Sequence, residues 1–205
     1  MTIVKTLASK PWLGASDTSD EPVAVNAFEL PVEKVGLRVF FIVATALFLL
    51  FIVGYRMRAT FADWQPLQDP LLLWFNTGLL ILASIALQWA KQAAASGQGA
   101  GVRNGLILGG SLSLAFIVAQ LTVWNQLSAA GHYVATNPAS SFFFLITAVH
   151  GLHILGGLVA WARTLTRIRR GESSEQIRLS VDLCAVYWHY LLVVWLVLFV
   201  LLLST

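Results

Sequence analysis

Charged residues are scarce in this sequence of 205 residues, since Asp, Glu, Lys and Arg together make up only 11% of it. Soluble domains carry about 25% charged residues, so this composition excludes a soluble domain with a single anchor. Hydrophobic residues account for 58% of the chain, and the mean hydropathy is +0.75. The sequence therefore predicts an integral membrane protein.

Cysteine is also nearly absent. It occurs once, as Cys184, so no internal disulfide can form, and its apolar surroundings indicate a small packing residue. The net charge of +3 comes from residues at the ends of the apolar segments. The basic excess therefore indicates membrane topology rather than binding to nucleic acid.

Acidic residues are missing from the body of every long apolar segment, and Asp182 stands only at the start of the last one. A proton relay inside a membrane normally uses buried carboxylates or a chain of histidines. The sequence therefore argues against an autonomous proton pump. It also carries no internal repeat, which argues against a secondary transporter.

Five apolar windows are each long enough to cross a bilayer, which takes about 20 residues of helix. They cover residues 35–55, 70–90, 104–124, 140–161 and 181–203. Short connections make neighbouring helices antiparallel, so we predict an all-α, polytopic membrane domain of five transmembrane helices over residues 34–205. Residues 1–33 are predicted to form a soluble tail, because no apolar core follows the early lysines as it would in a signal peptide.

Basic residues are unequally divided between the two ends of these predicted helices. The end shared with the N-terminus holds Lys5, Lys10, Lys34, Arg38, Lys91, Arg103, Arg163, Arg167, Arg169, Arg170 and Arg178, and the opposite end holds Arg56 and Arg58. This asymmetry predicts a cytoplasmic N-terminus and a C-terminus outside. We expect Arg163, Arg167, Arg169 and Arg170 to face anionic headgroups, with docking of a partner as the alternative.

Three histidines lie inside the last two windows. His150 and His153 are three residues apart and are predicted to share a helix face, and His189 lies on the following helix. One interpretation is a metal or haem site built from neutral imidazoles. The other is that they hydrogen-bond between helices or line a lipid cleft.

Small and polar residues in the windows are expected to mediate helix packing, because small residues let backbones approach and polar side chains bond between helices. The glycines in this group are Gly105, Gly109, Gly110, Gly156 and Gly157, and the polar residues include Asn76 and Gln120.

Three segments carry a resemblance to a known family. Residues 142–157 read Phe-Phe-Phe-Leu-Ile-Thr-Ala-Val-His-Gly-Leu-His-Ile-Leu-Gly-Gly, and residues 187–199 read Tyr-Trp-His-Tyr-Leu-Leu-Val-Val-Trp-Leu-Val-Leu-Phe. Residues 76–84 read Asn-Thr-Gly-Leu-Leu-Ile-Leu-Ala-Ser. In this order and spacing they resemble subunit III of the haem-copper respiratory oxidases, in its short bacterial form with five helices. The resemblance covers about residues 35–205.

The sequence departs from that family at two carboxylates. Ala44 stands where the family has a glutamate in its first core helix, and Leu192 stands where the last motif has an aspartate. Roles of those acids cannot be carried over to this chain, which looks like a divergent branch.

The resemblance implies an accessory subunit with no catalytic residue, haem, copper or other metal of its own. It implies packing on subunit I, beside subunit II, in a complex of the bacterial inner membrane that reduces dioxygen and translocates protons. It also implies a V-shaped bundle of two and three helices, whose cleft holds phospholipid that aids dioxygen access and proton uptake. The residues expected to define the cleft and helix contacts are Asn76, His150, His153, His189 and Trp195.

Two alternatives stay open. One is a subunit III-like protein associated with a nitric oxide reductase. The other is a stand-alone membrane protein that binds haem or copper through the three histidines.

Overall fold

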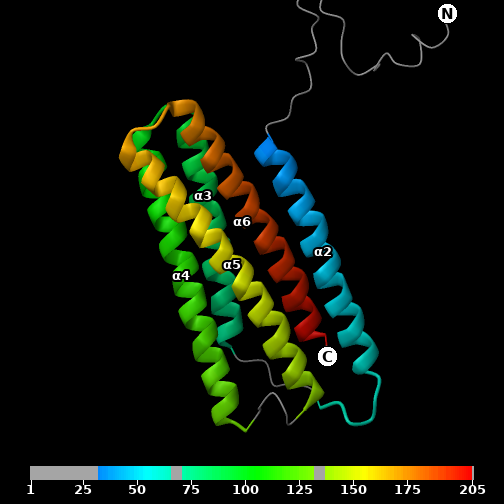
Figure 1. The fold of residues 1–205 in the computed structure, drawn as a ribbon. Coiled ribbons are helices and arrows are strands. Elements are labelled where there is room, and N and C mark those ends of the chain that lie inside the picture. Colours follow the sequence, from blue (N-terminus) through cyan, green and yellow to red (C-terminus); the bar gives the residue numbers. More distant parts are fainter. Residues whose placement is uncertain (1–31, 66–70, 132–136, 205) are drawn as a thin grey trace, which may run out of the picture. The chain divides into compact units, whose positions relative to one another are not determined.

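The computed structural model describes residues 32–65, 71–131 and 137–204, and most of these residues are helical (Figure 1). Its helices are α2 (Val32–Arg58), α3 (Leu72–Ala95), α4 (Gly99–Ala129), α5 (Pro138–Arg170) and α6 (Ser174–Leu203). Each is long and apolar enough to cross a membrane, which confirms the predicted all-α fold with five transmembrane helices. The predicted tail falls almost wholly outside the described residues, and α2 already begins at Val32.

The ends of α5 follow directly from the local sequence. Asn137 precedes the helix, and its side chain accepts a hydrogen bond from the Ala139 amide at 3.1 Å, while Pro138 occupies the first turn. This is a favoured helix start, because proline lacks the amide that would otherwise be unpaired. Gly171 ends the helix with φ of 68°, a left-handed conformation that glycine adopts without strain. The short turn after it sends α6 back antiparallel to α5.

The helices α3, α4, α5 and α6 pack against one another as a four-helix bundle, and α2 contacts only α5 and α6 (Figure 1). The most extensive contact joins α3 to α4. The described helices thus group as four and one, and the V-shaped arrangement of two and three is not confirmed. This grouping leaves a space between α2 and the rest of the bundle, which becomes the candidate site.

Glycines set the close contact between α3 and α4. A Cβ atom placed on Gly105 would lie 2.9 Å from the Ala86 carbonyl oxygen and 2.8 Å from the Ala90 Cβ. A Cβ on Gly109 would lie 2.7 Å from a carbon of Leu87. These positions lie one turn apart, as in the small-residue contacts that bring membrane helices together. The expected close approach is therefore confirmed here.

The other glycines of the predicted group behave differently from one another. A Cβ on Gly110 would meet the Trp161 ring, and one on Gly157 would meet the Tyr187 ring at 2.6 Å. Gly156 has no such neighbour within 4 Å, so the expectation of a close contact there is wrong. Gly156 instead faces the space beside α2.

Polar contacts fasten α2 to the bundle at the end where it begins. Asp182 of α6 lies 3.4 Å from the Lys34 ammonium of α2 and 2.7 Å from the Lys91 ammonium of α3. Deeper along α2, the Thr45 and Tyr190 hydroxyls lie 3.0 Å apart. Ion pairs that reach solvent stabilise weakly, and α2 has less contact with the other described helices than any of them has. We therefore expect α2 to be the least firmly held of the five. We call this end of the molecule, marked by Asp182, the basic end.

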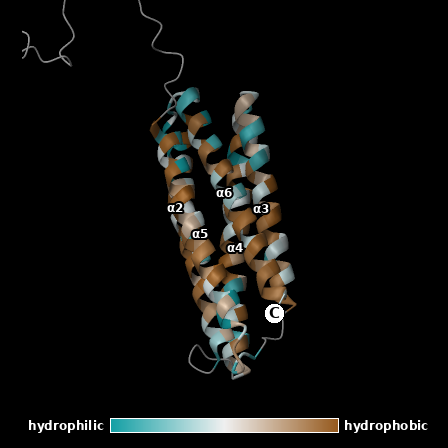
Figure 2. Cartoon of the chain, turned by 90° about the vertical axis from the view of Figure 1, so that its right-hand side faces the viewer, coloured by the Kyte–Doolittle hydropathy of each residue, from teal (hydrophilic) through white to brown (hydrophobic). Residues whose placement is uncertain are grey.

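Hydrophobic residues predominate along the helices between the two ends of the bundle (Figure 2), and many large ones are exposed on the outer surface. Ile42 and Leu50 of α2 are both 70% exposed, and Val118 of α4 is 64% exposed. Such a surface is stable against lipid chains, not against water. Several polar side chains lie buried in the interior instead, and they pair between helices.

Candidate functional site

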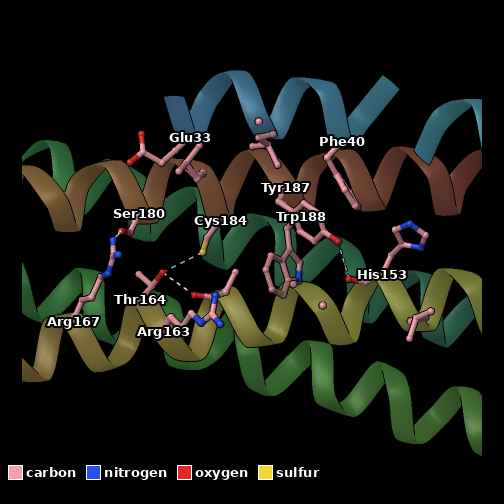
Figure 3. Close-up of a pocket in the computed structure, with 17 residues that line it drawn as sticks. Glu33, Phe40, His153, Arg163, Thr164, Arg167, Ser180, Cys184, Tyr187 and Trp188 are labelled. Atoms are coloured by element: carbon pink, nitrogen blue, oxygen red, sulfur yellow. Dashed lines mark hydrogen bonds between the residues drawn. The ribbon is translucent and has the colours of Figure 1, made fainter. Parts of the chain in front are cut away.

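A cleft of about 720 Å³ lies between α2, α5 and α6 (Figure 3). Gly36, Leu37 and Phe40 form its α2 wall. Apolar residues of α5 and α6, among them Leu152 and Leu183, form the other walls. The cleft is thus mostly hydrophobic, and it opens beside the helix that is held least firmly.

Charged side chains gather at the end of the cleft nearest the basic end. Glu33 lies on α2, and Arg163 and Arg167 lie one turn apart on α5 (Figure 3). Arg167 donates a hydrogen bond to the Ser180 hydroxyl at 2.8 Å and lies 3.6 Å from a carboxylate oxygen of Glu172. Both arginines are exposed, so their guanidinium groups are accessible to an anion at this end.

Aromatic and imidazole rings close the inner end of the cleft. The His153 Nδ1 atom donates to the Val149 carbonyl at 2.7 Å, which leaves Nε2 to face other partners. Tyr187 donates its hydroxyl to the His153 carbonyl at 2.8 Å. The Phe40 ring lies 5.7 Å from the imidazole and 5.8 Å from the Tyr187 ring.

The length of the cleft follows from helix geometry. Arg167 and His153 are 14 residues apart on one helix, which corresponds to about 21 Å at 1.5 Å per residue. The site therefore has a charged end at the level of Arg167 and an apolar part that extends to the level of His153. That polarity matches an amphiphile with an anionic head and a long hydrocarbon chain.

Cys184 and Thr164 form part of the wall behind the cleft. Their side chains lie 3.4 Å apart, and both residues are buried (Figure 3). Cys184 thus lies where a small side chain is needed, which agrees with its interpretation as a packing residue.

The predicted site residues are divided among the cleft, the interior of the bundle and exposed surfaces of α5 and α6. His153, Arg163 and Arg167 line the cleft, whereas Arg169 and Arg170 are exposed away from it. Asn76, His150 and Trp195 lie inside the four-helix bundle. His189 is exposed on α6, and its Nδ1 atom donates to the Ala185 carbonyl.

The buried set forms contacts between helices. Asn76 of α3 donates to the Gln120 side chain of α4 at 2.8 Å, and the Trp195 indole of α6 donates to the Thr77 hydroxyl at 3.0 Å. The His150 ring of α5 lies 5.1 Å from the Trp195 ring. Each of the four helices therefore contributes to one buried polar region.

The structure does not bring the three histidines together. His150 faces the bundle interior, His153 faces the cleft and His189 lies on an outer surface. Within residues 32–65, 71–131 and 137–204, no group of three or more His, Cys, Asp or Glu side chains is placed to hold a metal ion. The hypothesis of a metal or haem site made from these histidines finds no support in the described part of the chain.

Apolar residues occupy the two positions at which the resemblance implied acids. Ala44 is 3% exposed, and Leu192 packs against the hydrophobic core of the bundle. The neighbour of Ala44, Thr45, provides the hydroxyl that meets Tyr190. Contacts that do not involve charge thus join α2 to α6 at this level.

Several cleft residues were not predicted from the sequence. Phe40, Thr164, Cys184 and Tyr187 all line it, together with Ser180. The sequence did contain a pattern that indicates part of this wall. Ser180, Cys184 and Tyr187 of α6 follow one another at spacings of four and three, which places them on one helix face. Only the position of α2 shows that this face looks onto a cleft.

Comparison with known proteins agrees with this architecture. Residues 33–204 match the family described as "Cytochrome c oxidase subunit III". "Cytochrome c oxidase subunit 3" of Thermostichus vulcanus is 28% identical over 196 residues, covering 92% of this chain and 96% of the relative. The protein of the same name from a Synechocystis species is 28% identical over 172 residues, covering 81% of this chain and 72% of the relative. The "Probable cytochrome c oxidase subunit 3" of Mycobacterium bovis is 29% identical over 140 residues, covering 67% of this chain and 69% of the relative. The match extends over all five helices, and the chain belongs to the cytochrome c oxidase subunit III family.

Proposed function

We propose that this chain is a non-catalytic accessory subunit of a haem-copper terminal oxidase. It packs on subunit I, beside subunit II, and those partners hold the haem and copper. The family match over residues 33–204 carries this proposal. The family name refers to the oxidase rather than to a nitric oxide reductase, which favours the oxidase as the assembly.

The proposed location is the bacterial inner membrane, with the basic end in the cytoplasm. Lys34, Lys91, Arg163 and Arg167 all lie at this end, where α2 begins. Basic residues next to membrane helices favour the cytoplasmic side. The C-terminal end of α6 then faces the outside.

The proposed occupant of the cleft is a phospholipid. Arg163 and Arg167 match a phosphate head, because guanidinium groups form charge-assisted hydrogen bonds with phosphate oxygens. Leu37, Phe40 and Leu152 match a hydrocarbon chain, which fills an apolar space without leaving polar groups unpaired. A lipid there supports α2, whose direct contacts with the bundle are few. The lipid also provides an apolar route for dioxygen. The charged end of the cleft lies at the proposed cytoplasmic surface, where it aids the uptake of protons by the complex.

Isolation of the tagged chain in a gentle detergent tests the assembly. We expect mass spectrometry to find a haem-bearing subunit I and a copper-binding subunit II, and the reduced-minus-oxidised spectrum to show haem bands. Co-isolation of nitric oxide reductase subunits instead would support the alternative partner. A colourless chain without either set would contradict the proposal.

Substitution of the two cleft arginines tests the lipid. Arg163→Gln with Arg167→Gln is expected to weaken retention of an anionic phospholipid, since each basic residue near a lipid headgroup contributes about 1 kcal/mol. For two arginines this corresponds to a loss of affinity of about 30-fold. Native mass spectrometry of the assembly, with the bound lipids counted, measures the effect.

The matched control is Arg169→Gln with Arg170→Gln, which removes the same charge from the same helix but not from the cleft. This variant is expected to retain lipid like the unaltered chain. Equal loss in both double variants would mean that overall charge, not the cleft, holds the lipid.

A further inference from the structure

His150 carries a feature that the accessory role does not explain. It is 0% exposed, it lies in the body of a transmembrane helix, and neither of its ring nitrogens has a hydrogen-bond partner. Aromatic rings surround it, with Phe48 at 6.3 Å, Phe116 at 6.0 Å and Trp195 at 5.1 Å between ring centres. A neutral imidazole has one donor and one acceptor, and leaving both unpaired in an apolar interior is unfavourable.

A second unpaired donor and acceptor lie in the same four-helix bundle. Asn76 and Gln120 are 0% and 4% exposed, and they form one hydrogen bond with each other. That bond leaves the Asn76 Oδ1 and the Gln120 Nε2 without partners. Exchanging the oxygen and nitrogen of both amides would still leave one acceptor and one donor unpaired, so amide orientation does not resolve the deficit.

Shared neighbours connect the imidazole to this amide pair. The Phe116 ring, which faces His150, belongs to α4 and lies one turn before Gln120. The Trp195 ring, which also faces His150, donates to Thr77, the residue next to Asn76 on α3. The two rings lie 5.0 Å from each other. These shared rings place the imidazole near the amide pair, in a region lined by residues of α3, α4, α5 and α6 and, through the Phe48 ring, of α2.

Chemistry limits what can satisfy these four atoms. No Asp, Glu, Lys or Arg is among the buried residues of the described chain, so the partner is not an ion pair. The imidazole and the amide pair each leave one donor and one acceptor unpaired, so their partner must both donate and accept hydrogen bonds. None of these residues lines the lipid cleft, so the cleft does not supply that partner. Water provides two donors and two acceptors, and buried waters typically make about three hydrogen bonds to otherwise unpaired groups.

We propose that the four-helix bundle holds at least one ordered internal water, which bridges a ring nitrogen of His150 to the Asn76–Gln120 pair. His150 then links α5 to α3 and α4 through a polar contact rather than standing alone among aromatic rings. None of these three residues lines the phospholipid cleft, and the proposal does not depend on the identity of the partner subunits.

X-ray radiolytic footprinting of the intact assembly in lipid nanodiscs, in water labelled with ¹⁸O, tests this directly. Ordered water next to a side chain is the source of oxidation inside a membrane protein. Phe116 and Trp195, whose rings face His150, are expected to incorporate labelled oxygen several-fold faster than Trp188. Trp188 is equally buried, and its indole donates to Ser113 at 2.7 Å, but its ring does not face His150. Equal slow labelling of all three rings would overturn the proposal.

Variants then locate the water. Asn76→Leu combined with Gln120→Leu is expected to reduce the labelling of Trp195 several-fold, whereas Thr122→Val is expected to leave it unchanged. Thr122 is a polar residue on the outer face of α4 that bonds only within its own helix. Unchanged labelling in the double variant would contradict the assigned partners.

If the double variant does not assemble, a high-resolution density map of the unaltered assembly decides the question. A peak within hydrogen-bond distance of a His150 nitrogen and of Asn76 or Gln120 supports the site. A direct bond between the imidazole and either amide, with no peak, overturns it.

Discussion

Gly105→Ala is expected to force α3 and α4 apart and to lower the free energy of unfolding of the bundle by about 1–3 kcal/mol. The added methyl group would lie 2.9 Å from the Ala86 carbonyl oxygen and 2.9 Å from the Ala90 amide nitrogen. Both are backbone atoms of α3, so no change of side-chain rotamer can relieve the contact. Alanine has the higher helix propensity, which offsets up to about 1 kcal/mol and makes any net loss a conservative measure of the clash.

The matched control for Gly105→Ala is Gly78→Ala. Gly78 lies in the body of α3, and a Cβ atom there would meet no neighbour within 4 Å. This variant is therefore expected to keep or slightly raise stability, by the same gain in helix propensity. Unfolding of both variants in mixed micelles with increasing SDS gives the comparison. Similar stabilities would mean that α3 and α4 do not approach at Gly105 as the structure has them.

The contact at Gly105 shows how far the sequence alone predicts the fold. Long apolar windows predict the five helices, because a bilayer requires about 20 apolar residues in a helix. A Gly-rich spacing also predicts that small residues lie in a helix interface. It does not identify the partner, which is why Gly157 meets Tyr187 while the adjacent Gly156 has no close neighbour. Whether a given glycine makes a close contact depends on where the neighbouring helix lies, which the spacing alone does not give.

The candidate site was only partly predictable for the same reason. Arg163, Arg167, Arg169 and Arg170 form one basic group in the sequence, but a spacing of four places only Arg163 and Arg167 on the face that lines the cleft. His150 and His153 were expected to share a face. The Phe48 ring of α2 contacts both imidazoles, at 6.3 Å from His150 and 5.3 Å from His153, so the two do share one side of α5. Only His153 lines the cleft, whereas His150 is fully buried. The sequence predicts which residues share a helix face, because that follows from their spacing. It does not predict which neighbouring space each of those residues borders, because that depends on where the other helices lie.

Trp195→Ala is expected to have the other large effect on stability. Trp195 is 0% exposed, its ring lies 5.0 Å from Phe116, and its indole donates to Thr77 at 3.0 Å. Truncating a buried Trp to Ala in soluble cores costs about 3–5 kcal/mol. Part of that range is transfer from water, which does not apply to a helix that stays in lipid, so the expected cost is about 3 kcal/mol, the lower end of the range.

Two further substitutions separate packing from hydrogen bonding at this position. Trp195→Phe keeps a ring but removes the N–H donor, and the expected cost is about 1 kcal/mol. The cost stays small because the Thr77 hydroxyl still donates to the Leu73 carbonyl at 2.9 Å and is not left unpaired. Trp89→Ala provides the control for loss of an indole, since Trp89 is 47% exposed on α3 and its removal leaves no internal cavity.

The same SDS titration ranks these variants, and the expected order of stability is Trp89→Ala, then Trp195→Phe, then Trp195→Ala. A Trp195→Phe variant as unstable as Trp195→Ala would assign the contribution of this residue to the indole hydrogen bond. A Trp195→Ala variant as stable as the Trp89 control would contradict a packed interior at this level. The expected order follows because lipid chains replace an exposed indole on the outer surface, whereas nothing in the enclosed bundle replaces a buried one.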